Sequence, residues 1–256
     1  MSGDVFMNKK LVNILSVLLL SISPTFVFAQ ETLLEYYPQD GYVLVTEKGV
    51  SSQKVSGDFL NKLKQLRGKK SEINSMAFTP DGKGWTIIAG GRGISENVEG
   101  GYVAAMKKLQ ASKSAIKSVA FNPSNWDAQH GFVIIHDKGY TAEGVTSKLK
   151  EKLDQFSNQP KGIKTVEFTP DGGWTVISAT QQWSRMIQGN EVKNNFIDRI
   201  RAAYLGGQKV ATASFNPQEY SKLYGWLLIT NKGYEGMNIP EKLRQDLLKF
   251  SIKALN

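Results

Sequence analysis

Few side chains in this chain belong to the types that usually carry catalysis. The 256 residues contain no cysteine, which excludes thiol nucleophiles, disulfides and thiolate metal sites. The two histidines, His130 and His136, lie six residues apart, which along a strand corresponds to about 20 Å, too far to share a metal. No nucleophile elbow, phosphate-binding loop or H-E-x-x-H helix occurs. We therefore predict no metal and no cofactor, and we expect both histidines to be exposed at a turn and a strand end.

One carboxylate is a candidate acid or base. Glu167 stands in a predicted strand at an inward-facing position that is small in other copies of the same segment, and a carboxylate there is unfavourable unless it is solvated or paired. Glycosidases need two convergent carboxylates, and we identify no second one at an equivalent position. Asp40, Asp81 and Asp171 fall in proline–glycine turns, where aspartate caps its own backbone. Catalysis around Glu167 is therefore an alternative and not the main hypothesis.

Basic residues at corresponding hairpin turns form the second candidate site. We call six residues the turn-face set: Lys48, Arg92, Lys138, Lys232, Trp183 and Arg185. If these turns share one face of the molecule, they form a cationic ring that attracts an anionic polymer or headgroup, and Trp183 can stack on a sugar ring. The simpler alternative is that the lysines and arginines are ordinary solvated residues beside an obligatory glycine.

A repeat must position both candidate sites. Five prolines, spaced 42 to 47 residues apart, stand at positions 38, 80, 123, 170 and 217. A strand of alternating polarity precedes each proline, and a tight turn follows it. A glycine–aromatic pair then opens an almost unbroken apolar strand, as in Trp85–Ile88, which is typical of a strand covered on both faces. A second hairpin turn and a short third strand complete the strand part of the unit.

The period then changes from 2 to 3.6 residues, which predicts a helix at the end of each unit. In the third copy Val145, Leu149, Leu153 and Phe156 fall on one helical stripe. We therefore predict an α+β repeat protein with five strand–strand–short strand–helix units over residues 31–70, 71–114, 115–161, 162–208 and 209–256, forming a single domain over 30–256.

The units are expected to close into a five-bladed propeller-like ring. An open stack needs polar capping repeats at its ends. Here the first and last copies are as apolar as the middle ones, with Tyr42–Val45 and Trp226–Ile229 in their second strands. A ring needs no cap. An open stack and two packed lobes are the alternatives.

The turn after the first strand carries a resemblance. Met76-Ala-Phe-Thr-Pro-Asp-Gly-Lys83 resembles the turn of WD40-like and related bacterial β-propeller repeats. The chain departs from WD40 repeats because it lacks the Gly-His and Trp-Asp dipeptides and has a helix where a fourth strand is expected. The resemblance implies a propeller-type fold and a generic binding platform, and it transfers no functional residue.

The N-terminal segment predicts export. Lys9 and Lys10 precede the apolar run Leu11–Ile22, and Val27-Phe28-Ala29 offers a cleavage site, so residues 1–29 read as a signal peptide. A retained N-terminal anchor is the alternative. The whole chain carries a net charge of +9, and removal of residues 1–29 leaves +8. We predict a secreted or periplasmic protein without a transmembrane span in its mature form.

The combined hypothesis is a secreted, non-enzymatic binding module. It would recognise an anionic glycan, an envelope component or a partner protein through the turn face, and nucleic acid is not the expected partner. Two alternatives remain: a glycan-active enzyme that uses carboxylates in a central channel, and a purely structural scaffold.

Overall fold

The chain folds into five three-stranded antiparallel sheets, each followed by a helix. The computed structural model describes residues 32–38, 41–124, 126–159, 162–178, 182–185, 195–217 and 225–255, without the side chains of 183–185. In chain order the strands of the five sheets are β1 (Leu33–Tyr37), β2 (Gly41–Thr46) and β3 (Gly49–Gln53); β4 (Ile73–Phe78), β5 (Trp85–Ala89) and β6 (Arg92–Glu96); β7 (Ile116–Phe121), β8 (Phe132–His136) and β9 (Gly139–Glu143); β10 (Ile163–Phe168), β11 (Trp174–Ser178) and β12 (Gln182–Arg185); β13 (Val210–Phe215), β14 (Trp226–Thr230) and β15 (Tyr234–Met237).

The helices follow the third strands. They are α1 (Gly57–Gly68), α2 (Gly101–Ala111), α4 (Ser147–Ser157), α6 (Phe196–Leu205) and α8 (Glu241–Lys249). An additional short helix, α3 (Trp126–Gln129), which the sequence pattern did not predict, lies between β7 and β8. The predicted order of strand, strand, short strand and helix is therefore present in each unit.

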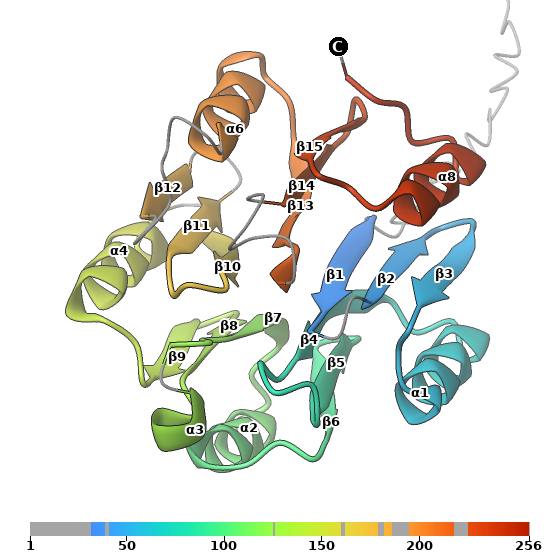
Figure 1. Ribbon diagram of the computed structural model, residues 1–256. Helices are drawn as coiled ribbons and strands as arrows, with labels where there is room; N and C mark the ends of the chain where they lie inside the picture. The colour runs from blue at the N-terminus through green and yellow to red at the C-terminus, as the bar shows by residue number, and fades with distance from the viewer. Residues whose placement is uncertain are drawn as a thin grey trace, which may run out of the picture.

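The sheets surround a common centre, with the helices on the outside (Figure 1). The first strands are innermost: β1 lies beside β4, β4 beside β7, β7 beside β10, β10 beside β13, and β13 beside β1. Short side chains link these strands. The hydroxyl of Ser118 donates to the carbonyl oxygen of Lys164 at 3.0 Å, and that of Ser75 accepts from the N–H of Val119 at 3.3 Å. Serine hydroxyls on the first strands therefore form hydrogen bonds with backbone groups of the neighbouring first strand, which that strand does not use within its own sheet.

Five apolar cores lie between neighbouring sheets, and each contains one helix. Phe59, Leu63 and Leu66 of α1 pack in a core shared by β2 and β5. The second strands β2, β5, β8, β11 and β14 are buried at every residue, as expected for strands covered on both faces. The aromatic residues that open or nearly open these strands lie in the cores, which confirms their predicted packing role: Tyr42, Trp85, Phe132, Trp174 and Trp226.

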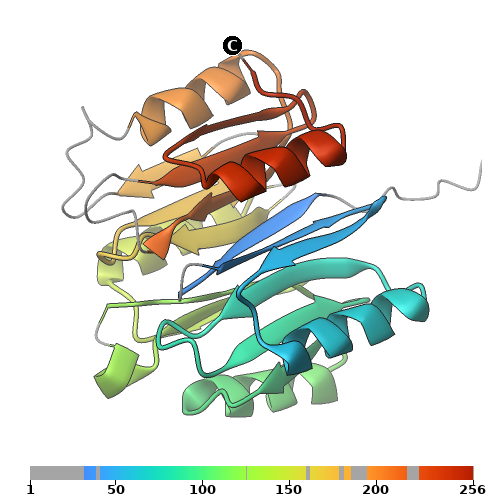
Figure 2. The same cartoon turned by 45° about the vertical axis from the view of Figure 1, so that its right-hand side comes forward.

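The last helix packs against the first sheet. Leu243 and Leu247 of α8 share a core with Leu34 and Leu44 of β1 and β2. The hydroxyl of Thr212 on β13 also donates to the carbonyl oxygen of Leu34 at 3.5 Å. Both views show α8 (red) beside the first sheet (blue) (Figures 1 and 2). These contacts and the five sheets form a propeller-like repeat fold, in agreement with the sequence prediction.

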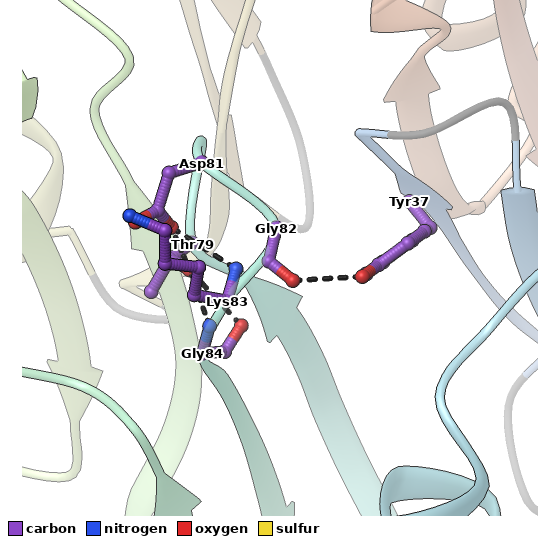
Figure 3. A network of polar contacts seen from close by, with 6 residues as sticks. All are labelled: Tyr37, Thr79, Asp81, Gly82, Lys83 and Gly84. Carbon is purple, nitrogen blue, oxygen red and sulfur yellow. Dashed lines mark hydrogen bonds and ion pairs between the residues drawn. The ribbon is translucent and has the colours of Figure 1, made fainter.

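The turn that carries the family resemblance is held by its own side chains (Figure 3). The hydroxyl of Thr79 donates to Asp81 Oδ1 at 2.6 Å and accepts from the N–H of Gly84 at 2.7 Å. The neighbouring sheet contributes the hydroxyl of Tyr37, which donates to the carbonyl oxygen of Gly82 at 2.7 Å. Asp81 therefore caps its own turn, as its position predicted, and its carboxylate serves the fold.

The glycine before the aromatic has a packing reason in three of the repeats. A Cβ on Gly84 would lie 2.2 Å from the carbonyl oxygen of Asn97, which follows the third strand. A Cβ on Gly131 would lie 2.5 Å from the equivalent carbonyl oxygen of Gly144, and one on Gly41 would lie 2.6 and 2.9 Å from those of Gln53 and Lys54. The Gly–aromatic signature of the repeat thus marks the close approach of the chain that leaves the third strand, and no side chain fits there.

Candidate functional site

A central cavity is built from all five first strands. Its wide part has a volume of about 560 Å³ and is lined from the N-terminal ends of these strands, including Leu33 of β1, Ser75 of β4, Ser118 of β7, Thr165 of β10 and Thr212 of β13. A narrow part of about 190 Å³ lies at their C-terminal ends, among the five proline turns. The wide part is within the size range of small-molecule sites in proteins.

Glu35 and Glu167 line both parts of the cavity. They occupy equivalent positions on β1 and β10, because Glu35 precedes Tyr36, which pairs with Tyr42, and Glu167 precedes Phe168, which pairs with Trp174. The remaining residues at this level are small: Ala77, Ala120 and Ser214. Glu35 and Glu167 therefore share the cavity with the short side chains of Ala120 and Ser214, which line its narrow part.

Within the part of the chain that the structure describes, each carboxylate has one hydrogen-bond donor. The backbone N–H of Phe78 on β4 donates to Glu35, and the hydroxyl of Thr165 donates to Glu167 Oε1 at 3.0 Å. Burial raises the pKa of Glu35 well above its usual value, and the charge of Glu167 raises it further against the effect of the Phe78 N–H. Burial likewise raises the pKa of Glu167 to about 8, against the hydrogen bond from Thr165. Near neutral pH the pair therefore retains a proton.

Glu35 is the acidic counterpart of Glu167 that we did not identify from the sequence, and it corrects the prediction that no second carboxylate stands at an equivalent position. The first repeat diverges, and its only clear marker is Pro38. Counting back from the prolines aligns Glu35 with Glu167, three residues before Pro38 and Pro170. That signal was present in the sequence. The sequence did not indicate that the two residues line one cavity, because β1 and β10 are far apart in the chain and are not neighbours among the first strands.

The wide cavity carries mixed charge at its rim. Glu72, Lys117 and Lys164 line it, and Glu72 and Lys117 are exposed. The ammonium of Lys164 donates to the carbonyl oxygen of Val210 on the next first strand at 2.8 Å. Lys164 therefore adds to the links between first strands, and Lys117 remains the exposed cation of this wall.

The turn-face set lies on the second hairpins, and two of its members hold the fold. The ammonium of Lys48 donates to the carbonyl oxygen of Phe250 at 3.2 Å, at the C-terminal end of α8. The ammonium of Lys138 donates to the carbonyl oxygen of Ser112 at 3.3 Å, at the C-terminal end of α2. A cation at this end complements the helix dipole and caps a free carbonyl. Lys48 thus links the first sheet to the last helix, and Lys138 links the third sheet to the helix of the second unit.

Arg92 and Lys232 are exposed and differ in position. Lys232 lies within its hairpin turn, as Lys48 and Lys138 do. Arg92 instead is the first residue of β6 and pairs with Ala89, so the turn of the second sheet consists of Gly90 and Gly91. Gly90 and Gly91 have positive φ values of 55° and 74°, a conformation that glycine adopts readily. Trp183 and Arg185 lie on β12, and their side chains fall outside the described residues.

The remaining predicted residues do not form a site. His136 is 8% exposed and not solvent-exposed as expected, because it closes β8 and its Nδ1 accepts from the N–H of Lys138 at 3.3 Å. Asp171 is bonded to Thr169, as Asp81 is to its own turn threonine, and Asp40 lies outside the described residues. Over the described part of the chain, no three acidic or histidine side chains gather to hold a metal ion. No helix among these residues is long and apolar enough to cross a membrane.

Comparison with known proteins gives a limited result. No protein-family model and no curated protein matches this chain. Among solved structures, the β-propeller domain of Myceliophteria thermophila Cps50 (Swd1) is 8% identical with a TM-score of 0.32, over 83% of this chain and 62% of that one. YCF48 bound to a D1 peptide is 10% identical with a TM-score of 0.29, over 81% and 66%. The WD40 domain of SCAP from fission yeast is 10% identical with a TM-score of 0.25, over 81% and 49%.

The chain thus spans about half to two thirds of the length of these structures. Two of the three are described as β-propeller or WD40 domains, the type of repeat that the FTPDG turn resembles. The propeller-like arrangement itself rests on the sheets and cores of this chain.

Proposed function

We propose that this protein is an exported, non-enzymatic binding module, shaped as a closed five-bladed propeller-like ring, that binds an anionic glycan on its turn face. The core between α8 and the first sheet supports closure of the ring, as does the hydrogen bond from Thr212 to Leu34. Export rests on the basic and apolar pattern of residues 1–29. It predicts that the protein recovered after secretion has Gln30 as its first residue, which an intact-mass measurement checks.

The observation that carries the binding proposal is the position of the wide cavity. Gly90, Gly91 and Lys117 lie in its wall, and Arg92 directly follows this glycine turn. A cavity within the size range of small-molecule sites therefore opens beside exposed cations. An anionic group of a polymer can contact these cations while the remainder of the chain lies over the opening. The two carboxylates deeper in the cavity disfavour entry of the anionic group itself, so its contacts belong at the rim.

The test removes charges whose side chains are exposed and have no hydrogen-bond or ion-pair partner among the described residues. Arg92→Gln combined with Lys232→Gln takes away two exposed cations of the turn-face set and leaves the helix caps at Lys48 and Lys138 intact. Lys64→Gln combined with Lys150→Gln is the matched control, because both lysines are exposed on outer helices. Retention is measured on an immobilised anionic polysaccharide as salt is raised.

Each outcome decides the proposal. If the rim variant elutes at clearly lower salt than the control variant, the turn face is a site. If both variants lose retention equally, the interaction is with the diffuse positive charge of the protein, and the turn-face proposal is wrong. A wild-type protein that is not retained at all also refutes glycan binding and directs attention to protein partners.

A second candidate is a glycan-cleaving enzyme, because the structure pairs Glu35 with Glu167 at the centre of the cavity. Glycoside hydrolysis requires two carboxyl groups, one of which acts as an acid and is favoured in that role by a raised pKa. Product release from anionic and neutral oligosaccharides, compared between wild type and Glu167→Gln, tests this candidate. Loss of a measured hydrolysis in the variant supports it, and an absence of products with the wild type rejects it.

A further inference from the structure

The narrow cavity has an apolar wall of regular construction. Its lining comes mainly from two positions of all five repeats, the aromatic residue near the end of each first strand and the proline of the following turn. These residues are Tyr36, Phe78, Phe121, Phe168 and Phe215, with Pro38, Pro80, Pro123, Pro170 and Pro217. Val119, Ala120 and Ser214 add small side chains. A collar of rings and prolines therefore surrounds a space of about 190 Å³.

The charged groups in the lining of this narrow space are two carboxylates. Glu35 and Glu167 lie where it meets the wide cavity, and neither forms an ion pair within the described part of the chain. Among the described residues each accepts one hydrogen bond, whereas a carboxylate offers about four acceptor sites. Glu35 and Glu167 are half-buried. Two such carboxyl groups in one cavity, with no cation paired to either among the described residues, repel each other when both are ionised, and they gain from a ligand that brings positive charge and hydrogen-bond donors.

We propose that the narrow cavity is a binding site for a primary alkylammonium group, with Glu35 and Glu167 as its anionic end and the aromatic–proline collar around its methylene chain. A primary ammonium has three donors and a compact charge, which suits two facing carboxylates. Its aliphatic stem suits an apolar wall. Ca²⁺ fits less well, since it takes six to eight oxygen ligands. This site lies at the opposite end from the turn face and takes a ligand of opposite charge, so it stands independently of the proposed function.

Protonation governs this site. The other ionisable groups that line the two cavities are Tyr36 at the narrow end and Glu72, Lys117 and Lys164 at the wide end. Because the raised pKa of Glu167, about 8, keeps a proton on the pair near neutrality, an ammonium ligand must displace it. Affinity should therefore rise between pH 6.5 and 8.5, with release of a proton on binding.

The experiment is a calorimetric titration of the purified protein with Nα-acetyl-lysine amide at pH 6.5 and 8.5. Nα-acetyl-norleucine amide has the same number of side-chain carbons and no ammonium, and serves as the ligand control. Buffers of different ionisation enthalpy report the proton released. We expect saturable binding of the lysine compound at pH 8.5, at least ten-fold weaker binding at pH 6.5, and at least ten-fold weaker binding of the norleucine compound.

Three variants locate the site. Glu167→Gln keeps the shape and removes one charge, and should weaken binding at least ten-fold. Ala120 lines the narrow part of the cavity and not the wide part. Ala120→Leu therefore fills the narrow cavity and should weaken binding although both carboxylates remain in place. Glu72→Gln removes an acid from the wide rim and should leave affinity unchanged. Thermal unfolding of each variant checks that it is folded, and the pH and norleucine comparisons on the wild type need no variant.

Several results overturn the proposal. One is the absence of binding at pH 8.5, and another is equal binding of the norleucine compound. Unchanged affinity in Glu167→Gln places the ligand elsewhere. Tighter binding of Nα-acetyl-arginine amide would reassign the site to a guanidinium ligand. Retention on an anionic polysaccharide has no bearing on any of these outcomes, so failure of one proposal leaves the other standing.

Discussion

Asp246 is the residue whose removal most directly tests how the two ends of the fold are joined. It lies on α8 and is 2% exposed. Its carboxylate accepts hydrogen bonds from the hydroxyls of Tyr42 on β2 and Ser51 on β3, the latter at 2.6 Å. Lys242 on the same helix donates to Asp246 Oδ1 at 2.9 Å. The last helix thus holds two strands of the first sheet through one buried carboxylate.

Replacing Asp246 by alanine should lower the free energy of unfolding by about 3 kcal/mol. A buried donor without a partner costs about 1–3 kcal/mol, and the hydroxyls of Tyr42 and Ser51 both lose their acceptor. The ion pair with Lys242 adds little, because that side chain is 55% exposed. Removing the carboxylate also removes the free-energy cost of burying its charge. The expected loss of stability is therefore smaller than the sum of the largest costs for the two hydroxyls.

The effect of Asp246 should also depend on pH. Burial raises the pKa of Asp246, but the hydrogen bonds from Ser51, Tyr42 and Lys242 outweigh burial and hold the pKa below its usual value. A carboxyl with a lowered pKa in the folded state stabilises the protein above its unfolded pKa, about 3.9, and loses this contribution as the pH falls through the folded value. The difference between wild type and Asp246→Ala should therefore be full at pH 7 and shrink below about pH 4.

Urea denaturation followed by circular dichroism measures both quantities. With an m-value of about 3 kcal/mol/M, a loss of 3 kcal/mol moves the midpoint down by about 1 M. Asp154→Ala is the matched control, because Asp154 also accepts from a tyrosine, Tyr140, at 2.7 Å, but is exposed. Equal midpoint shifts for the two variants would refute the argument that burial of the network joins the last helix to the first sheet.

Three further substitutions test other parts of the structure. Gly84→Ala should destabilise the protein by about 1–3 kcal/mol, because its Cβ would lie 2.2 Å from the carbonyl oxygen of Asn97, whereas Gly68→Ala, with open space around it, should be neutral or slightly stabilising in thermal denaturation. Wild-type stability should fall from about pH 4.5 to 8, because over this range Glu167 loses its proton in the unfolded state before it does so in the folded state, where its pKa is about 8. The free energy of unfolding of Glu167→Gln should depend less on pH over this range. An identical slope for the two proteins would contradict a raised pKa at Glu167. Lys48→Gln should cost about 0.3–1 kcal/mol, since it loses a helix cap, and should leave polysaccharide retention close to that of a single-charge control; a larger loss of retention would assign Lys48 to the binding surface.

The sequence alone determined the local elements, because these depend on short-range patterns. The prolines at 38, 80, 123, 170 and 217 marked the first turns, and the change from a period of 2 to 3.6 residues located the helices. The Gly–aromatic pairs marked second strands that the structure buries at every residue. Asp81 was assigned to its own turn, which requires only neighbouring residues.

Tertiary structure decided everything that depends on which units become neighbours. Glu35 and Glu167 could be aligned by counting from Pro38 and Pro170, but only the arrangement of first strands around one cavity makes their charges interact. Lys48 and Lys138 were interpreted from the sequence as surface charges, and the structure shows that they cap helices, because α8 ends beside the turn of Lys48 and α2 ends beside that of Lys138. No local pattern encodes such contacts, since each unit buries its apolar faces only against the next one.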